Sequence, residues 1–319
     1  MTIEVLDHGA SLPIALDAAI EQVATGFVFT EGALWHSQQS YLLFSDIIGN
    51  QMHRWDAEQG LSSFRQPSQM ANGNAWDREG RLLTCEHASS RVTRTEPDGS
   101  ITVLASHFEG RALNSPNDIV VRTDGSIYFT DPIFGRRAPH GVPREPELDH
   151  SSVYRIDPRD GSLSRLSPRL EQPNGLCCSL DEALLYVNDS PRKQIHVYDL
   201  ERDGSVSAGR LFAEVPGDEP GVPDGMKVDL QGHVYCCGPG GIHVFSPQGQ
   251  RLARIRFPEK ACNFAFGDAD HKTLYVTACT SVYRVRLLVA GKPQWPLPMS
   301  GRREPQRLDP GPDPGTTPE

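Results

Sequence analysis

The chain has 319 residues and a formal net charge of -10, with 38% hydrophobic and 23% charged residues. This is enough apolar material for a sizeable core, so a wholly disordered chain is excluded, and the acidic balance argues against nucleic acid as a partner. With 29 glycines and 26 prolines, the composition favours short strands joined by turns over long helices.

The N-terminal region gives no sign of export. Residues 1–20 contain neither a basic n-region nor a continuous apolar stretch, and nothing further along is long enough to span a bilayer. The adjacent pairs Cys177-Cys178 and Cys236-Cys237 fall in predicted strands, where neighbouring side chains point to opposite faces, so they are typical of a reducing compartment. We therefore expect a cytoplasmic protein with no membrane partner, and a monomer.

A short phrase recurs six times along the chain, each time followed by a pattern of strand, turn and strand. In chain order, the six phrases begin at Glu31, Asn72, Asn117, Asn174, Asp224 and Asn263. Their spacing of roughly 40 to 57 residues matches a four-stranded propeller blade, whereas a β-sandwich would not repeat a phrase at this length. The sequence predicts an all-β, six-bladed β-propeller over residues 1–290. We expect residues 2–28 to supply the strand that closes the ring.

Two segments interrupt or follow the repeats. Residues 132–150 form an insertion between two strands of the third blade, which is either a lid over a site or a mobile surface loop. Residues 291–319 are dominated by Pro, Gly, Arg and Asp, and we expect a disordered tail there.

The first residues of the six phrases form a column of polar side chains. Because the first strand of each blade lies nearest the axis, this column predicts a ring around one mouth of the channel. Glu31 and Asp224 would repel each other there, and a cation would relieve that repulsion. Oxygen ligands favour Ca²⁺ first, with Mg²⁺, Mn²⁺ or Zn²⁺ also possible. The alternative is that Asn-Gly and Asp-Gly are simple turns, which we favour for Asn72 and Asn263 taken alone but not for Glu31.

Other polar residues are weaker candidates. Glu86 and His87 lie at a strand end, where a single histidine is more often structural. Arg136 and His140 on the insertion are candidate substrate contacts. No Gly-x-Ser-x-Gly elbow is present, which argues against a serine hydrolase.

From about Phe27 to Arg286, the chain resembles the SMP-30/gluconolactonase/luciferin-regenerating family of six-bladed propellers. The motifs that carry the resemblance are Glu31-Gly-Ala-Leu-Trp, Cys85-Glu-His, Ser115-Pro-Asn-Asp-Ile-Val-Val, Ile127-Tyr-Phe-Thr-Asp-Pro, Pro173-Asn-Gly-Leu and Pro223-Asp-Gly-Met. The resemblance implies one divalent metal held by Glu31, Asn174 and Asp224, with Asn117 as a further ligand or a substrate contact. Some members carry an Arg that holds the substrate where this chain has Ser115, so the chain departs from the family pattern at this position.

The implied activity is hydrolysis of a sugar lactone such as an aldonolactone. The cation would polarise the lactone carbonyl, and Asp224 would take the proton from the attacking water. Two alternatives remain: the same site acting on another sugar-acid lactone or an organophosphate, and a propeller that only binds partners. Converging carboxylates argue against the second, because a pure interaction module does not need them.

Overall fold

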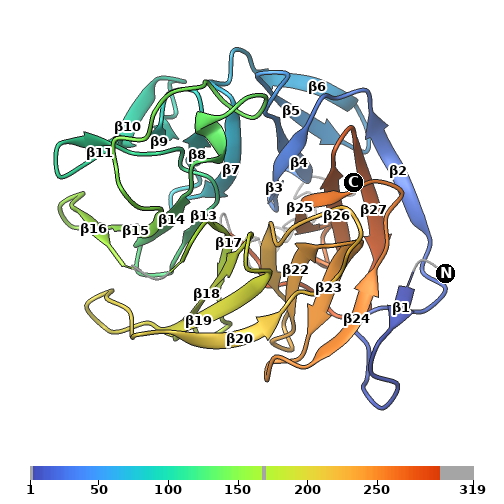
Figure 1. Ribbon diagram of the computed structural model, residues 1–319. Helices are drawn as coiled ribbons and strands as arrows, with labels where there is room; N and C mark the ends of the chain where they lie inside the picture. The colour runs from blue at the N-terminus through green and yellow to red at the C-terminus, as the bar shows by residue number, and fades with distance from the viewer. Residues whose placement is uncertain (1–2, 167–169, 295–319) are drawn as a thin grey trace, which may run out of the picture.

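Short antiparallel strands make up six blades around a central channel in the computed structural model, which describes residues 3–166 and 170–294 (Figure 1). The predicted all-β, six-bladed propeller is confirmed. Within these residues the only helix is the single turn η1 (Phe134–Arg136), so no described helix is long enough to cross a membrane.

The first three blades follow the chain in order. Blade one contains β3 (Thr30–His36), β4 (Tyr41–Asp46), β5 (Gln51–Asp56) and β6 (Gly60–Arg65). Blade two contains β7 (Ala71–Trp76), β8 (Leu82–Glu86), β9 (Arg91–Thr95) and β10 (Ile101–Ala105). A small ribbon of β11 (His107–Phe108) and β12 (Arg111–Ala112) leads to blade three, which contains β13 (Ile119–Val121), β14 (Ile127–Asp131), β15 (Ser152–Ile156) and β16 (Leu163–Arg165).

The last three blades continue the ring, and the final two also take strands from the N-terminus. Blade four contains β17 (Pro173–Cys178), β18 (Leu184–Asp189), β19 (Gln194–Asp199) and β20 (Arg210–Glu214). Blade five contains β21 (Met226–Val228), β22 (Val234–Gly238), β23 (Gly241–Phe245), β24 (Arg251–Ile255) and β1 (Ile3–Val5). Blade six contains β25 (Ala261–Gly267), β26 (Thr273–Ala278), β27 (Ser281–Arg286) and β2 (Ile20–Thr25).

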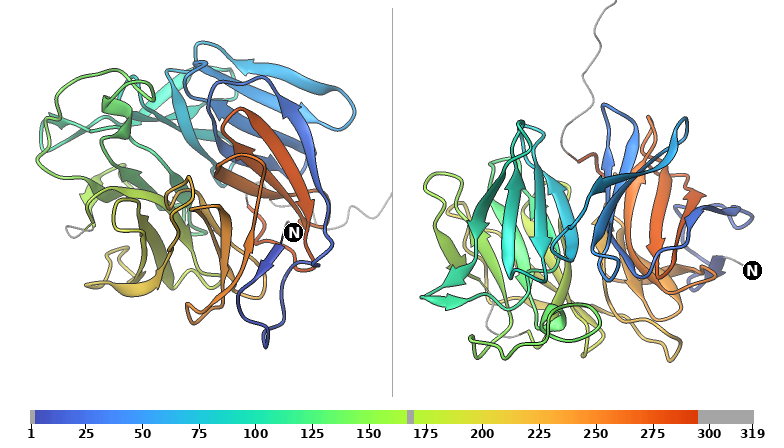
Figure 2. Two further views of the ribbon diagram at one scale, coloured as in Figure 1. Left: turned by 45° about the vertical axis from the view of Figure 1, so that its right-hand side comes forward. Right: turned by 90° about the horizontal axis from the view of Figure 1, so that it is seen from above.

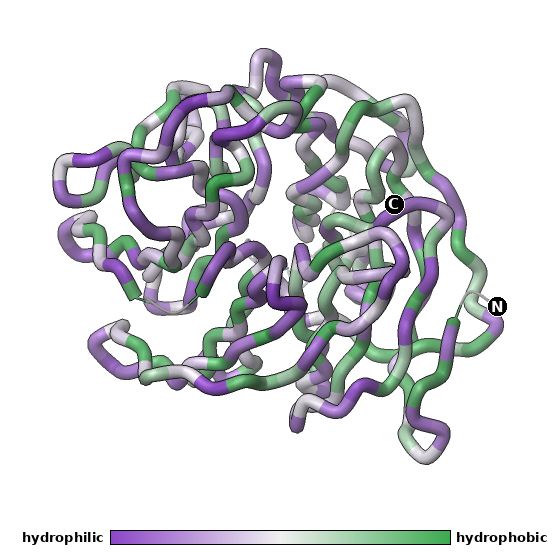
Figure 3. The backbone as a smooth tube through the Cα atoms, in the orientation of Figure 1, coloured by the Kyte–Doolittle hydropathy of each residue, from purple (hydrophilic) through white to green (hydrophobic). Residues whose placement is uncertain are grey.

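The hydrophobic core lies between neighbouring blades, because each inner strand is covered on both faces. Apolar and polar residues alternate along many strands, as the hydropathy colouring shows (Figure 3). At the seam between blades one and six, Trp35 stacks on Tyr275 with ring centroids 5.1 Å apart. A Cβ atom at Gly267 would lie 2.8 Å from the Trp35 ring, so glycine allows this close approach. Each innermost strand contacts those of the adjacent blades, from β3 round to β25 and back to β3.

The N-terminal segment closes the ring, as predicted. Strand β2 is the outermost strand of blade six, where Ile20 pairs with Val285. Strand β1 was not expected as a separate addition; it extends blade five, where Ile3 pairs with Ile255. One segment therefore fastens two neighbouring blades along their outer edge (Figure 2).

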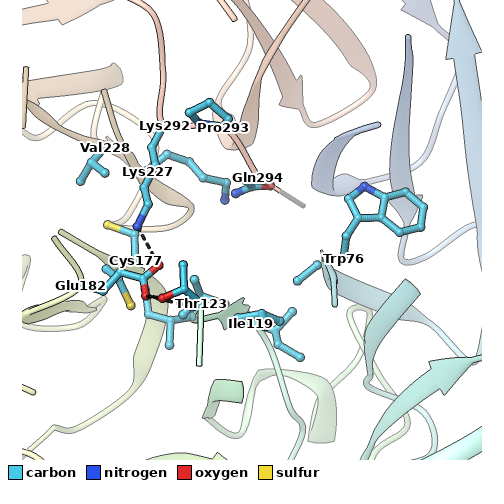
Figure 4. Close-up of a pocket in the computed structure, with 15 residues that line it drawn as sticks. Trp76, Ile119, Thr123, Cys177, Glu182, Lys227, Val228, Lys292, Pro293 and Gln294 are labelled. Atoms are coloured by element: carbon cyan, nitrogen blue, oxygen red, sulfur yellow. Dashed lines mark hydrogen bonds and ion pairs between the residues drawn. The ribbon is translucent and has the colours of Figure 1, made fainter. Parts of the chain in front are cut away.

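The opposite end of the channel from the polar column holds a cavity of about 260 Å³, where the innermost strands end (Figure 4). Lys292 covers part of it: its Nζ lies 3.0 Å from a carboxylate oxygen of Glu182, whose other oxygen accepts hydrogen bonds from the amide and hydroxyl of Thr123. Gly291 also forms a β-bridge with Asp229. The first residues of the segment predicted as a tail thus contact the propeller, and 295–319 lie outside the described residues, so that part of the prediction stays a prediction.

Candidate active site and metal centre

A cavity of about 300 Å³ opens at the mouth of the channel where the innermost strands begin. Five of the six side chains in the predicted column line it: Glu31, Asn72, Asn117, Asn174 and Asp224. All five are buried, with at most 8% of each residue exposed. The structure therefore brings together all four predicted metal ligands and the predicted base.

Backbone hydrogen bonds between blades fix the register of this column. The amide of Gly73, which follows Asn72, donates to the carbonyl of Asn117 at 2.8 Å. Between blades one and two, a Cβ atom at Gly32 would lie 1.9 Å from the carbonyl oxygen of Asn72, so only glycine fits there. Gly32, Gly73 and Gly175 thus each let one blade approach the carbonyl oxygen of the column residue in the next blade.

The same pattern corrects the predicted column in blade six. The amide of Gly225 donates at 2.9 Å to the carbonyl of Cys262, which makes Cys262 the sixth member of the ring. Asn263 was expected there but lies one residue further on, and its Oδ1 accepts a hydrogen bond from the amide of Phe264. The same register shift occurs at the start of β3, β7, β17 and β25, and in each strand the ring residue directly follows the first paired residue, so Cys262 follows Ala261 as Glu31 follows Thr30.

Three acidic side chains concentrate negative charge at this end of the channel. Burial, together with the nearby charge of Asp118, raises the pKa of Glu31 to about 7. Burial and the charge of Glu31 raise the pKa of Asp224 well above its usual value. Burial likewise raises the pKa of Asp118, which lies in the same part of the channel. A cation beside these groups would favour their charged forms.

The donor atoms fit a divalent metal ion. One carboxylate oxygen each from Glu31 and Asp224 and the sulfur of Cys262 all lie within 4.8 Å of one another. Asn174 donates through Nδ2 to the hydroxyl of Ser190 at 3.1 Å. Its buried Oδ1 has no hydrogen-bond partner among the described residues. Because an unpaired buried carbonyl oxygen is costly, this atom is well suited to bind a cation.

Lys260 also lines the cavity and adds a positive charge to its wall. This residue was not predicted from the sequence. Its Nζ lies 4.8 Å from the centre of the Phe29 ring. Burial lowers the pKa of Lys260, but nearby thiols and the carboxylates of Asp224 and Glu31 outweigh this effect and raise it. The ammonium group therefore stays charged at neutral pH beside the acidic centre.

A buried histidine connects the ring to the insertion. Nδ1 of His87 lies 2.8 Å from the carbonyl oxygen of His140, and its Nε2 lies 3.1 Å from Nδ2 of Asn72. A carbonyl only accepts, so Nδ1 carries the proton and Nε2 accepts from Asn72. Burial lowers the pKa of His87 to about 4, which keeps the ring neutral. His87 thus orients one wall of the cavity and is more than an isolated structural histidine.

The insertion forms part of the cavity wall and is closely attached to the propeller. The hydroxyl of Ser115 accepts a hydrogen bond from the amide of Gly135 at 2.9 Å and donates to the carbonyl of Pro132 at 2.5 Å. Arg144 donates to the carbonyl of His87 at 2.8 Å. The residue that stands where some relatives carry an Arg therefore holds the insertion in place.

The two substrate contacts predicted on the insertion have different outcomes. His140 lines the cavity, with its ring 4.6 Å from that of Phe29. Arg136 does not line it, because its guanidinium is buried and donates to the backbone carbonyls of Leu113, Asn114 and Glu145. We therefore correct that expectation. Arg137, the residue directly after η1, is the arginine that lines the cavity.

Comparison with known proteins identifies the family of the chain. Fold and site define a six-bladed propeller with an acidic, partly amide-lined cavity at one mouth of its channel. Residues 29–280 match the model of the SMP-30/Gluconolactonase/LRE-like region, and the chain belongs to this family.

Three relatives extend the comparison. A gluconolactonase of Zymomonas mobilis is 32% identical over 300 residues, covering 85% of this chain and 82% of the relative. A pentonolactonase of Haloferax volcanii is 30% identical over 258 residues, covering 77% and 80%. A solved gluconolactonase structure from Xanthomonas campestris has a TM-score of 0.83 and 36% identity, covering 90% of this chain and 95% of that one.

Proposed function

We propose that this protein is a lactonase that opens a sugar lactone of the aldonolactone class by adding water, with a divalent metal ion as cofactor. The observation that carries the proposal is the convergence of Glu31, Asp224 and the unpaired Oδ1 of Asn174 on one buried cavity. The names of the family and of the relatives in Zymomonas and Haloferax support the substrate class.

We assign the metal to Glu31, Asn174 and Asp224, with Asn117 as a further ligand or a contact to the substrate. Ca²⁺ is the first expectation for the oxygen donors, with Zn²⁺, Mn²⁺ and Mg²⁺ as alternatives. When bound, the cation would supply Lewis-acid polarisation of the lactone carbonyl.

The protein's own residues account for the remaining steps. Asp224, one of the two ring carboxylates that line the cavity, is our choice for the base that takes the proton from the attacking water. Lys260, His140 and Arg137 offer donors to the hydroxyl groups and ring oxygen of the sugar. The cavity of about 300 Å³ matches one small substrate. A cytoplasmic monomer without nucleic-acid or membrane partners remains our prediction.

The choice between lactones is open to a direct comparison. One relative is named for a six-carbon and another for a five-carbon sugar lactone, so both are candidates here. An organophosphate remains the more distant alternative for the same site. A propeller that only binds partners is disfavoured, because three buried carboxylates would cost stability without a role.

The test is a lactonase assay on metal-stripped protein. Purified protein is treated with a chelator and resupplied with one ion at a time, and acid release from glucono-1,5-lactone and from a pentonolactone is followed at constant pH. We expect activity to disappear and then to return with a divalent ion. Binding of the ion without hydrolysis of any aldonolactone would contradict the substrate assignment, and full activity without metal would contradict the cofactor.

A further inference from the structure

The sixth member of the ring is a thiol, which distinguishes this centre from one built only of oxygen donors. Cys262 takes the place in blade six that Asp224 takes in blade five, as the hydrogen bond from Gly225 to its carbonyl shows. Its side chain is fully buried, and its sulfur lies within 4.8 Å of carboxylate oxygens of both Glu31 and Asp224.

The sulfur of Cys262 has two weak hydrogen-bonding neighbours, one of which is the thiol of Cys279. The thiol donates a long hydrogen bond to the carbonyl of Lys260, at 3.5 Å. Cys262 is not paired in a disulfide. The unpaired Oδ1 of Asn174 is a second, independent sign that the centre is built for a ligand. The set of donor atoms therefore mixes oxygen and sulfur: it contains two carboxylates, one amide oxygen and one thiol.

We propose that Cys262 is a thiolate ligand of the metal, and that it shifts the preference of the centre from Ca²⁺ toward a thiophilic divalent ion such as Zn²⁺. This inference rests on the metal site in the proposed function. When the ion binds, a metal–sulfur bond forms in place of the S–H bond, and the thiol proton leaves to solvent. Ca²⁺ takes oxygen ligands almost exclusively, whereas Zn²⁺ binds thiolate readily, so one sulfur among the donors separates the two ions.

The test uses full-length, chelator-stripped protein and Co²⁺ as a spectroscopic probe. We expect Co²⁺ to produce a thiolate-to-cobalt charge-transfer band in the near ultraviolet. Calorimetry with Zn²⁺ and Ca²⁺ is run in parallel on the unaltered protein, on Cys262→Ser and on Cys178→Ser. Cys178 is the matched control, because it is also a buried cysteine on an innermost strand but lies at the opposite end of the channel.

The expected result is loss of the band in Cys262→Ser and its retention in Cys178→Ser. We expect Zn²⁺ affinity to fall at least about tenfold in Cys262→Ser, the lower end of what loss of a supporting group at a metal site costs, with Ca²⁺ affinity changed little. Cys262→Asn, which gives blade six the amide found in three other blades, should also lose the band and bind Ca²⁺ more tightly.

Contrary outcomes separate this inference from the proposed function. If Co²⁺ and Zn²⁺ bind the unaltered protein without the band and as tightly as they bind Cys262→Ser, the sulfur is not a ligand while the metal site stands. If no divalent ion binds the unaltered protein, both fail. Binding of Co²⁺ to the unaltered protein without the band would by itself overturn the inference, whether or not the three variants fold.

Discussion

Nδ2 of Asn72 lies 3.1 Å from Nε2 of His87, so a residue of the ring and a residue at a strand end hold each other in place. The other nitrogen of the imidazole holds the carbonyl of His140 at 2.8 Å. The position of the insertion and the orientation of the ring amide thus depend on one neutral histidine.

His87→Ala should weaken both the fold and the activity. It removes a buried ring and leaves an amide and a carbonyl without partners, which we expect to lower the free energy of unfolding by about 3 kcal/mol. His87→Gln keeps one donor and one acceptor and should lose less. Denaturant unfolding and kcat/KM measure the two effects, with the exposed His107→Ala as control. Equal stability of His87→Ala and the unaltered protein would show that the connection is unimportant.

Asp224→Asn should keep the fold and lose most of the activity. The amide has nearly the shape of the carboxylate but cannot accept a proton from water, so we expect kcat to fall at least about 100-fold. Removing one of two repelling carboxylates should leave the thermal stability of metal-free protein equal or higher. Near-normal turnover would remove the proposed role of Asp224. An exposed carboxylate, as in Asp181→Asn, serves as control.

Lys260→Met should weaken substrate binding and destabilise the metal-free protein. The variant keeps much of the apolar stem but removes the charge that lies beside Glu31 and Asp224. We expect KM to rise more than kcat falls, and the melting temperature of metal-free protein to drop. Lys260→Arg should retain both properties in part. An unchanged KM in Lys260→Met would show that the ammonium group of Lys260 does not contact the substrate.

His243 should make the fold sensitive to acid. It is fully buried in β23, and burial lowers its pKa from 6.5 to about 4. Between these pH values the unfolded chain binds a proton that the folded chain does not, so stability present above pH 6.5 is lost as pH falls toward 4. The loss from this group approaches about 3 kcal/mol. Unfolding free energies of the unaltered protein and His243→Gln across this range test this, and parallel pH curves would contradict it.

Truncation at the N-terminus should separate the roles of β1 and β2. Deleting residues 1–19 removes the buried side chains of Ile3 and Ile14 and should cost about 3 kcal/mol or more. Deleting residues 1–26 also removes β2 and opens blade six, so we expect no folded protein. Thermal unfolding followed by circular dichroism distinguishes the two. A 1–26 deletion as stable as the full chain would show that β2 does not close the ring.

The sequence predicts much of the architecture because the repeat is local. Each blade carries a version of the same phrase. Where a glycine follows the column residue, a side chain there would clash with the next blade. Glu31 and Asp224 can therefore be placed in one ring from the amino-acid sequence alone.

The remaining features depend on shifts of one residue that no pattern reveals. The prediction chose Asn263 in blade six by residue type, whereas Cys262 directly follows the first paired residue of β25, as Glu31 does in β3. The turn of η1 likewise turns Arg137 rather than Arg136 toward the cavity. Lys260 was missed because it lies before its strand and outside the repeated phrase. The only signal in the sequence is the pair of charged residues in Pro258-Glu-Lys260, just before an apolar strand.

The pairing of the first strands with the last has a consequence for the growing chain on the ribosome. Nε2 of Gln22 in β2 donates to the hydroxyl of Ser281, a residue 259 positions later. The N-terminal segment is made first but finds its partners only when blades five and six have emerged. Until then its strands have unpaired edges, and closing so long a loop carries an entropic cost. Emergence of β24 and β27, the partners of β1 and β2, is therefore the event that allows the ring to close.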